Sequence, residues 1–312
     1  METLDERWDA LGVDAGEAVY QLIDASHPLR FYIGISAEAK RQLLLVSAEQ
    51  PAASVDYQHL RIQSFQRADG LWSLILQLED SSLEEVFATL CEDLVVRTRH
   101  LKDPERPIRP LMRRLVQWLD LLAKRRSATL STGEIRGLAG ELLALHSVVR
   151  AEIGLPSALR AWTGPQGADQ DFRTPSKCWE VKTVQPAAAA VQISSEDQLD
   201  IDGPAELVVI ILDESEVAGD DTFTLNALVA ERRAELSADI DLRDLLDDRL
   251  IQAGYLPRPE YDLSHFTLMK VRRFSVSGDF PRLRRSTLAA GIESLSYSIR
   301  LDALGAFELP QT

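Results

Sequence analysis

The feature that most constrains the fold is an apolar run near the middle of the chain, ELVVIIL at residues 206–212. Its length suits a buried strand and falls far short of the roughly 18 residues that a membrane-spanning helix needs. A helix is predicted upstream over 129–154, and a brief helix in SSEDQLD precedes the run. Between the two helices the pattern predicts short strands around Trp162, 171–173, 179–184 and 191–194. Residues 129–212 therefore follow the order α-β-β-β-α-β.

The regions on either side also mix the two element types. Residues 30–80 contain four strand-like segments separated by turn residues, which predicts a small antiparallel sheet. A helix follows over 81–100, and the proline-rich segment DPERPIRP at 103–110 suggests a domain boundary before a basic helix at 111–126. The last hundred residues alternate helix and strand. We predict an N-terminal β-rich domain, a core with its preceding helices and a C-terminal α/β region, over 1–107, 108–215 and 216–312.

The net charge of −15 over 312 residues is unevenly distributed. Residues 196–248 contain 17 acidic and 3 basic residues, whereas residues 97–126 contain 10 basic and 3 acidic ones. Residues 262–300 add 7 basic residues against 3 acidic ones. The negative total therefore does not exclude nucleic acid as a partner. The basic segments are either solvated faces or a path for a DNA backbone, and the acidic segment suits a solvated face or a basic protein partner.

Cysteine usage and the N-terminal sequence indicate the compartment. The chain has two cysteines, Cys91 and Cys178, and five scattered histidines, which exclude a Cys/His zinc pattern and argue against a disulfide framework. The first residues, METLDERWDA, are acidic and polar, unlike a signal peptide. We therefore expect a protein of the reducing cytoplasm with no membrane partner.

The stretch DFRTPSKCWEVKT at 171–183 carries the residues that suggest chemistry. A strand places residues i and i+2 on one face, so Glu180 and Lys182 project together and Val181 points into the core. A turn at TPSK brings Asp171 opposite or diagonal to Glu180. Two carboxylates, water and the Val181 carbonyl form the oxygen ligands that Mg²⁺ prefers. A lysine beside them can help to deprotonate a metal-bound water or stabilise charge on a phosphate.

The preceding helix supplies a third acid. Gly137 and Gly140 lie three residues apart in its interior, where glycines usually mark close backbone packing, and Glu141 follows at once. Glu141 could bind the same metal directly or through water. Asp169 competes with Asp171, because both share one face of a regular strand, and Asp171 is preferred because it lies closer to the hairpin.

The Glu-x-Lys pattern alone is uninformative, because it arises by chance and usually marks an exposed strand face or an ion pair. The order of the elements around it favours a metal-dependent nuclease, and a structural ion cluster on an ordinary fold is the alternative. Gln192, on the next strand, either orients a substrate phosphate or simply ends a strand face.

These segments resemble the bacterial family named for its PD-(D/E)XK motif, which occurs among restriction and phage-defence gene clusters. The likeness lies in STGEIRGLAGELLAL, WTGPQGADQDF, WEVKT and VQISSEDQLD, at 131–145, 162–172, 179–183 and 191–200. Segments near both ends extend it over most of the chain. The resemblance implies an α/β (α+β) fold: a restriction-endonuclease-like αβββαβ core with an N-terminal antiparallel β-rich region and a C-terminal α/β extension.

The resemblance also implies an activity, the Mg²⁺-dependent hydrolysis of DNA phosphodiester bonds, with Mn²⁺ as a substitute. It implies Asp171 and Glu180 as metal ligands, Lys182 as the catalytic lysine and Glu141 as the helix acid. The chain departs from the motif at Gln170, which stands where the family's name has proline.

The second expectation is a non-catalytic subunit that uses the same fold to bind DNA or protein. The expected partners are DNA and either a second copy of the chain or other subunits of a defence complex. A dimer is expected because double-strand cleavage normally needs two active sites.

Overall fold

The computed structural model describes residues 3–12, 17–51, 55–57, 59–99, 108, 111–112, 114–116, 118–119, 129–219, 221–292 and 295–310. The chain forms two compact units, Met1–Ala128 and Thr129–Thr312. It has helices together with antiparallel and mixed sheets, so the predicted α/β (α+β) class is confirmed. Among these residues, no helix combines the length and the apolar character that a membrane crossing requires.

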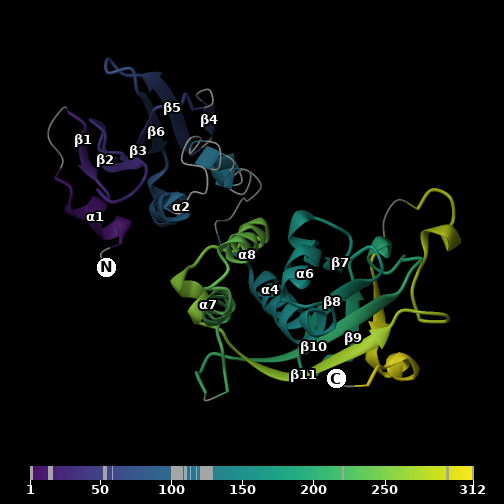
Figure 1. The fold of residues 1–312 in the computed structure, drawn as a ribbon. Coiled ribbons are helices and arrows are strands. Elements are labelled where there is room, and N and C mark those ends of the chain that lie inside the picture. The colour runs from purple at the N-terminus through teal and green to yellow at the C-terminus, as the bar shows by residue number, and fades with distance from the viewer. Residues whose placement is uncertain are drawn as a thin grey trace. The chain divides into compact units, whose positions relative to one another are not determined.

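The first unit is built on an antiparallel sheet with the strand order β1-β2-β3-β6-β5-β4 (Figure 1). The small antiparallel sheet predicted over 30–80 is therefore confirmed. Four of its strands coincide with the four predicted segments, and β1 and β4 extend the sheet at its two edges. The bounds are Val19–Leu22 for β1, Arg30–Ile35 for β2, Arg41–Ser47 for β3, Val55–Tyr57 for β4, Leu60–Gln66 for β5 and Trp72–Leu78 for β6.

Two helices complete the described part of this unit's core. Helix α1 spans Leu4–Ala10, and a 3-10 turn leads into α2 at Glu84–Thr98. The rings of Trp8 and Phe87 pack with their centroids 5.5 Å apart. The described positions between residues 108 and 119 are helical. Much of the basic segment predicted over 97–126, including residues 120–126, lies outside the described residues.

The second unit contains a four-stranded sheet in the order β11-β10-β8-β7. Strand β10 runs parallel to β8, and the other pairs are antiparallel. The side chains of β10 alternate between two cores, with Val208 and Ile210 on one face and Leu207 and Val209 on the other. The buried strand predicted at 206–212 is therefore confirmed. The bounds are Phe172–Arg173 for β7, Cys178–Val184 for β8, Ala205–Ser215 for β10 and His265–Ser275 for β11.

Helices cover one face of this sheet, and a small second sheet covers the other (Figure 1). The helix predicted over 129–154 is present as α4, which continues through a π turn at Leu145–Val149 into α5. The second sheet pairs β9 with β12. The bounds are Thr132–Ala144 for α4, Arg150–Ile153 for α5, Leu155–Ala161 for α6, Leu225–Glu235 for α7, Ile240–Gln252 for α8, Ala190–Ile193 for β9 and Tyr297–Arg300 for β12.

The core differs from the predicted order at three places. The strand predicted around Trp162 is only an isolated bridge to Phe172 at the end of α6. The helix predicted in SSEDQLD is a single 3-10 turn at Glu196–Gln198, because Gly203 and Pro204 follow too closely for a longer helix. Strand β9 pairs with β12 instead of joining the main sheet. The units also begin and end at other positions than the three predicted regions, since β11 pairs along β10 and so brings residues beyond 215 into the same unit as the core.

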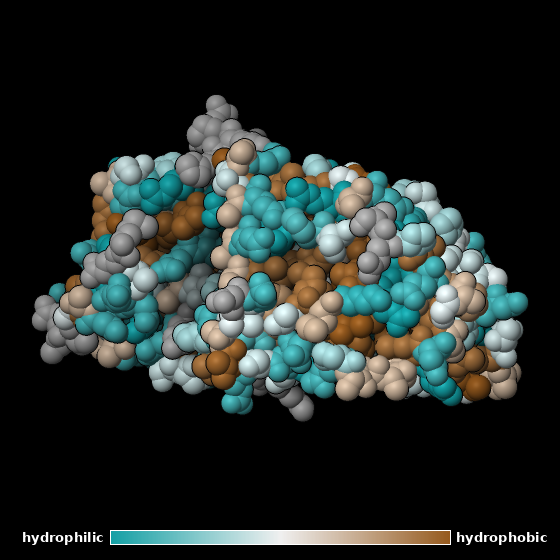
Figure 2. Space-filling view, turned by 90° about the horizontal axis from the view of Figure 1, so that it is seen from below, coloured by the Kyte–Doolittle hydropathy of each residue, from teal (hydrophilic) through white to brown (hydrophobic). Residues whose placement is uncertain are grey.

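The surface mixes polar and apolar residues on the face seen from below Figure 1 (Figure 2). Four large apolar side chains of the described residues are more than half exposed, namely Val96, Val217, Leu263 and Met269. Met269 lies on β11, the outer strand of the second unit's main sheet. That sheet therefore presents an uncovered apolar side chain at its edge.

Candidate active site

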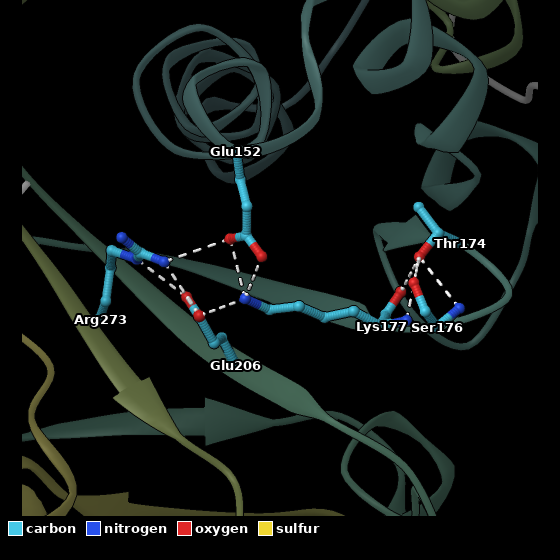
Figure 3. A network of polar contacts seen from close by, with 6 residues as sticks. All are labelled: Glu152, Thr174, Ser176, Lys177, Glu206 and Arg273. Atoms are coloured by element: carbon cyan, nitrogen blue, oxygen red, sulfur yellow. Dashed lines mark hydrogen bonds and ion pairs between the residues drawn. The ribbon is translucent and has the colours of Figure 1, made fainter.

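A tight hairpin between β7 and β8 positions the predicted acids. Phe172 pairs with Trp179 and Arg173 with Cys178, so the register places Asp171 beside Glu180, as the spacing predicts. Thr174 fixes the turn (Figure 3): its N–H donates to the Lys177 carbonyl at 2.8 Å, and its hydroxyl accepts from the Lys177 N–H at 2.9 Å. The turn thus sets which residues of the two strands face each other.

The Asp171 carboxylate is oriented by the main chain of β8. Its Oδ2 accepts the Val181 N–H at 2.7 Å, and the Asp171 carbonyl accepts the N–H groups of Thr163 and Gly164 at 2.8 and 2.9 Å. The N–H and C=O groups of one strand residue point to the same edge, so the Val181 carbonyl also faces the side on which Asp171 lies. The Val181 side chain is buried in the core, as predicted.

Asp169, the competing acid, is not part of this arrangement. It is exposed, while the neighbouring Gln170 is buried and donates its side-chain amide to the Asp197 carbonyl at 2.8 Å. Strand β7 begins only at Phe172, so the regular alternation that would put Asp169 and Asp171 on one face does not apply. The structure brings Asp171, and not Asp169, to the hairpin's acidic edge.

Glu180 and Lys182 project together from β8. Glu180 is only 1% exposed, and Lys182 Nζ lies 2.7 Å from its Oε1. That contact is an ion pair by distance but lacks hydrogen-bond geometry, so neither Glu180 oxygen accepts a hydrogen bond from the residues that the structure describes. Burying a carboxylate in this state costs free energy, and a cation bound beside it would offset that cost.

Helix α4 brings Glu141 to the same place. Its Oε2 accepts the Trp162 indole N–H at 2.7 Å. A β-carbon built on Gly164 would lie 2.8 Å from Asp171 Oδ1 and 3.3 Å from Glu141 Oε2. The two carboxyl groups therefore face one point, and only glycine fits there without displacing one of them. Both residues are partly buried.

The glycines of α4 differ in their role. A β-carbon on Gly140 would lie 1.8 Å from Thr183 Oγ1, so the helix backbone rests directly on β8. The close packing predicted for Gly140 is confirmed. The same prediction is wrong for Gly137, because a β-carbon there would meet nothing within 4 Å.

Burial raises the pKa of all three acids, and neighbouring acids add to the shift for Glu141 and Glu180. Burial, with the Asp171 charge, raises the pKa of Glu141 to about 8, although the Trp162 N–H and Lys182 oppose the shift. Burial raises the pKa of Asp171 to about 6 against the effect of the Val181 N–H. The pKa of Glu180 also lies well above its usual value, through burial and both neighbouring acids. A further positive charge would favour the ionised form of all three.

The donor set fits a hard divalent cation. Within the described ranges no three or more His, Cys, Asp or Glu side chains are placed as a ready metal cluster. Asp171, Glu180 and the Val181 carbonyl nevertheless supply only oxygen ligands, and no described residue donates a hydrogen bond to the Glu180 oxygens. Mg²⁺ typically takes one or two carboxylates and keeps several waters, so it does not need a three-acid cage.

The C-terminal basic residues are largely neutralised within the protein. The possible DNA path at 262–300 contains Lys270, Arg272, Arg273, Arg282, Arg284 and Arg285. Four of the arginines pair with acids and one with main-chain carbonyls: Arg272 with Glu308, Arg273 with Glu206, Arg284 with Asp202, Arg285 with Glu196, and Arg282 with the carbonyls of Leu199 and Ile201. Their contact with DNA stays a prediction.

Sequence reasoning missed three residues of the site and left one open. Trp162 is fully buried, and its N–H also donates to Glu141. Gly164 and Gln198, which accepts from Lys182 Nζ at 3.0 Å, stand in no periodic or spaced pattern that could have revealed them. Gln192 accepts a hydrogen bond from the Ser298 hydroxyl at 2.7 Å across β9 and β12.

A comparison with known protein families gives one match that includes these elements. A family model described as "Putative PD-(D/E)XK family member, (DUF4420)" matches residues 4–302. The chain belongs to this family. The resemblance inferred from the sequence motifs is therefore confirmed, and the match includes the hairpin and α4. Membership suggests a nuclease-like fold. Searches of the curated proteins and of the solved structures gave no match.

Proposed function

We propose that this member of the PD-(D/E)XK family is a metal-dependent endonuclease that hydrolyses phosphodiester bonds in DNA. The observation that carries the proposal is the unmatched acidic site. Glu141, Asp171 and Glu180 interact electrostatically beside one lysine, and no donor among the described residues hydrogen-bonds to the buried Glu180 oxygens. A fold that only needed stability would not leave a buried acid in this state.

Asp171, Glu180 and the Val181 carbonyl are the proposed holders of Mg²⁺, with Mn²⁺ as a substitute. The bound cation would supply the positive charge that activates a water and stabilises charge on the phosphate. The Val181 N–H fixes the direction of the Asp171 carboxylate. Lys182 provides N–H donors for a phosphate oxygen. Glu141 Oε2 is held by Trp162, so Glu141 acts through water rather than as a direct ligand.

The DNA backbone needs cations that the protein's own acids do not neutralise. Arg160 on α6 and Arg173 on β7 are exposed, and neither forms an ion pair with any acid of the described ranges. Helix α6 contacts β7, and β7 directly follows Asp171. We propose that Arg160 and Arg173 contact phosphates next to the cleaved bond and so position the DNA without reading its sequence.

The proposed setting is a bacterial restriction or phage-defence system in the cytoplasm. The protein would act there as a homodimer or with other subunits of a complex, because cutting both strands normally requires two active sites. This setting rests on the resemblance of the motifs.

One observation favours a second function, a non-catalytic subunit that binds DNA or protein. Leu268 and Met269 are 38% and 56% exposed on β11, the outer strand of the main sheet. An exposed apolar strand edge is suited to pairing with another chain.

A cleavage assay separates the two functions. Supercoiled plasmid, linear duplex and single-stranded DNA are incubated with the purified protein in Mg²⁺, Mn²⁺ or EDTA. The variants Asp171→Asn, Glu180→Gln and Lys182→Ala are each expected to lose about 1,000-fold in rate or more. The matched control is Asp169→Asn, which changes an exposed acid two residues away and is expected to cut like the wild type.

Two outcomes would redirect the proposal. Cleavage that survives all three site substitutions would show that the hairpin does not carry the chemistry. A wild type that cuts no substrate in either metal would favour the non-catalytic subunit. Calorimetric titration of the wild type and Glu180→Gln with Mn²⁺ tests the metal site without relying on activity.

A further inference from the structure

Lys182 contacts Gln198 as well as Glu180. The Gln198 amide oxygen accepts Lys182 Nζ at 3.0 Å and the Ser194 N–H at 2.9 Å. Both partners are donors, so this end of the amide must be the oxygen. The lysine ammonium is thus shared between a carboxylate, 2.7 Å away, and a neutral amide.

This second acceptor changes what Lys182 can do. A lone ammonium beside a buried carboxylate is drawn fully onto it, because attraction between opposite charges is strong where water is excluded. The Gln198 oxygen is fixed by the Ser194 main chain and competes for the same ammonium. Lysine has three N–H donors. The hydrogen bond to Gln198 uses one of them, and the ion pair with Glu180 has no hydrogen-bond geometry, so an N–H is left for a substrate oxygen.

The turn that carries Gln198 is itself anchored on both sides. The Asp197 carbonyl accepts the Gln170 side-chain amide at 2.8 Å, and Gln170 directly precedes Asp171. The buried Glu196 carboxylate accepts the Leu295 N–H at 3.2 Å and pairs with Arg285. The 3-10 turn Glu196–Gln198 therefore fastens both arms of the hairpin, through Gln170 on one arm and Lys182 on the other.

We propose that Gln198 is a positioning residue, which directs the Lys182 ammonium so that one N–H faces a phosphate oxygen of bound DNA. The inference rests on the proposed nuclease function. It predicts that loss of the amide oxygen slows the reaction while DNA still binds.

Steady-state cleavage kinetics in Mg²⁺ test this prediction with three variants. Gln198→Leu removes the acceptor at similar size, and its kcat is expected to fall about 10- to 100-fold, with KM for DNA changed less than about twofold. Gln198→Glu keeps an acceptor oxygen and is expected to retain a higher kcat than the leucine variant. The matched control is Gln252→Leu on α8. Gln252 also accepts from a basic side chain, Arg249, at 3.1 Å, and this variant is expected to match the wild type.

A wild-type kcat in Gln198→Leu would overturn the inference. So would a rise in KM alone, or an equal loss in both glutamine variants. A second readout does not depend on cleavage: NMR of ¹⁵N-labelled lysine ammonium groups in the metal-free protein. The Lys182 signal, identified by its absence in Lys182→Ala, is expected to exchange slowly with water in the wild type and to be lost in Gln198→Leu.

The two readouts keep the proposals apart. If the wild type cuts no DNA, the proposed function fails, and the lysine signal alone decides whether Gln198 holds Lys182. If the wild type cuts but the signal is the same with and without Gln198, the nuclease proposal stands and the positioning role is wrong.

Discussion

Two ion clusters lie along the same strand and differ in how their charges are matched. The first lies at the start of β8 and joins Glu152, Lys177, Glu206 and Arg273 (Figure 3). Lys177 Nζ lies 2.7 Å from Glu152 Oε1 and 2.5 Å from Glu206 Oε1, and Arg273 Nε lies 2.8 Å from Glu206 Oε2. Two acids meet two bases, and each carboxylate accepts hydrogen bonds. We call this the balanced cluster.

The second cluster, of Glu141, Asp171, Glu180 and Lys182, sets three acids against one base. Its most buried acid, Glu180, accepts no hydrogen bond within the described part of the chain, and the pKa of each acid is raised. We call this the acidic cluster. Matched charges in the first cluster serve the structure, whereas unmatched charges in the second suit the binding of a cation and a substrate. The balanced cluster is complete and ties the hairpin turn to α5, β10 and β11, whereas the acidic cluster is complete only when a cation and a substrate are added.

The largest expected difference between the clusters is in cleavage. Glu180→Gln removes a proposed metal ligand and is expected to lower the rate by about 1,000-fold or more, whereas Glu206→Gln, in the balanced cluster, should stay within about threefold of the wild type. Initial rates on supercoiled plasmid, at a temperature where both variants are folded, measure the contrast. Equal losses in the two variants would show that the clusters do not differ in function.

The free energy of unfolding should change in the opposite order, with the larger loss in Glu206→Gln and little or no loss in Glu180→Gln. Glu206→Gln leaves Lys177 and Arg273 short of a carboxylate in a largely buried network, and is expected to lower the free energy of unfolding by about 2–3 kcal/mol. Glu180→Gln removes an acid whose charge is poorly matched, so in EDTA the free energy of unfolding should stay the same or rise. Urea unfolding followed by circular dichroism measures both. A destabilised Glu180→Gln would mean that its ion pair with Lys182 is a structural one.

The acidic cluster should also make metal-free stability depend on pH. The pKa of Glu141 is about 8 in the folded protein and about 4.5 in the unfolded chain. Such a group binds more protons when folded, so its stabilising contribution is complete below pH ~4.5 and is lost as the pH rises through ~8. The melting temperature in EDTA is therefore expected to fall from pH ~6 to ~8.5. Glu141→Gln should fall less steeply, and parallel curves would contradict the pKa assignment.

The parts of the second unit that the sequence predicted are those determined by local pattern. The turn at TPSK and the spacing around it determine the hairpin, and the alternation of Glu180 and Lys182 with Val181 determines which of them share a face. The run at 206–212 forms a buried strand because its apolar side chains, 207–212, need a core on one face or the other. Each of these features depends on residues close together in the chain.

Features that depend on tertiary placement could not be predicted in this way. The choice between Asp171 and Asp169 depends on where β7 begins, and a strand of two residues leaves no pattern that marks its start. The contact of Gln198 with Lys182 joins residues 16 positions apart through an irregular turn. Strand β9 pairs with β12 about a hundred residues later, which no local periodicity indicates.

The smallest expected effect is on DNA binding, and it is tested by replacing one arginine beside each cluster. Arg173, next to the acidic cluster, has no acid partner in the part of the chain that the structure covers, whereas Arg273 is held by Glu206 in the balanced cluster. Arg173→Ala should weaken DNA binding a few-fold. It should also reduce the slope of log K against log salt concentration by about 1, which corresponds to one lost phosphate contact. Arg273→Ala should leave that slope unchanged. Fluorescence anisotropy with duplex DNA in EDTA, between about 50 and 200 mM salt, gives both slopes. If only Arg273→Ala changed the slope, the DNA path would lie over the balanced cluster, and the division between a structural and a substrate-binding cluster would be wrong.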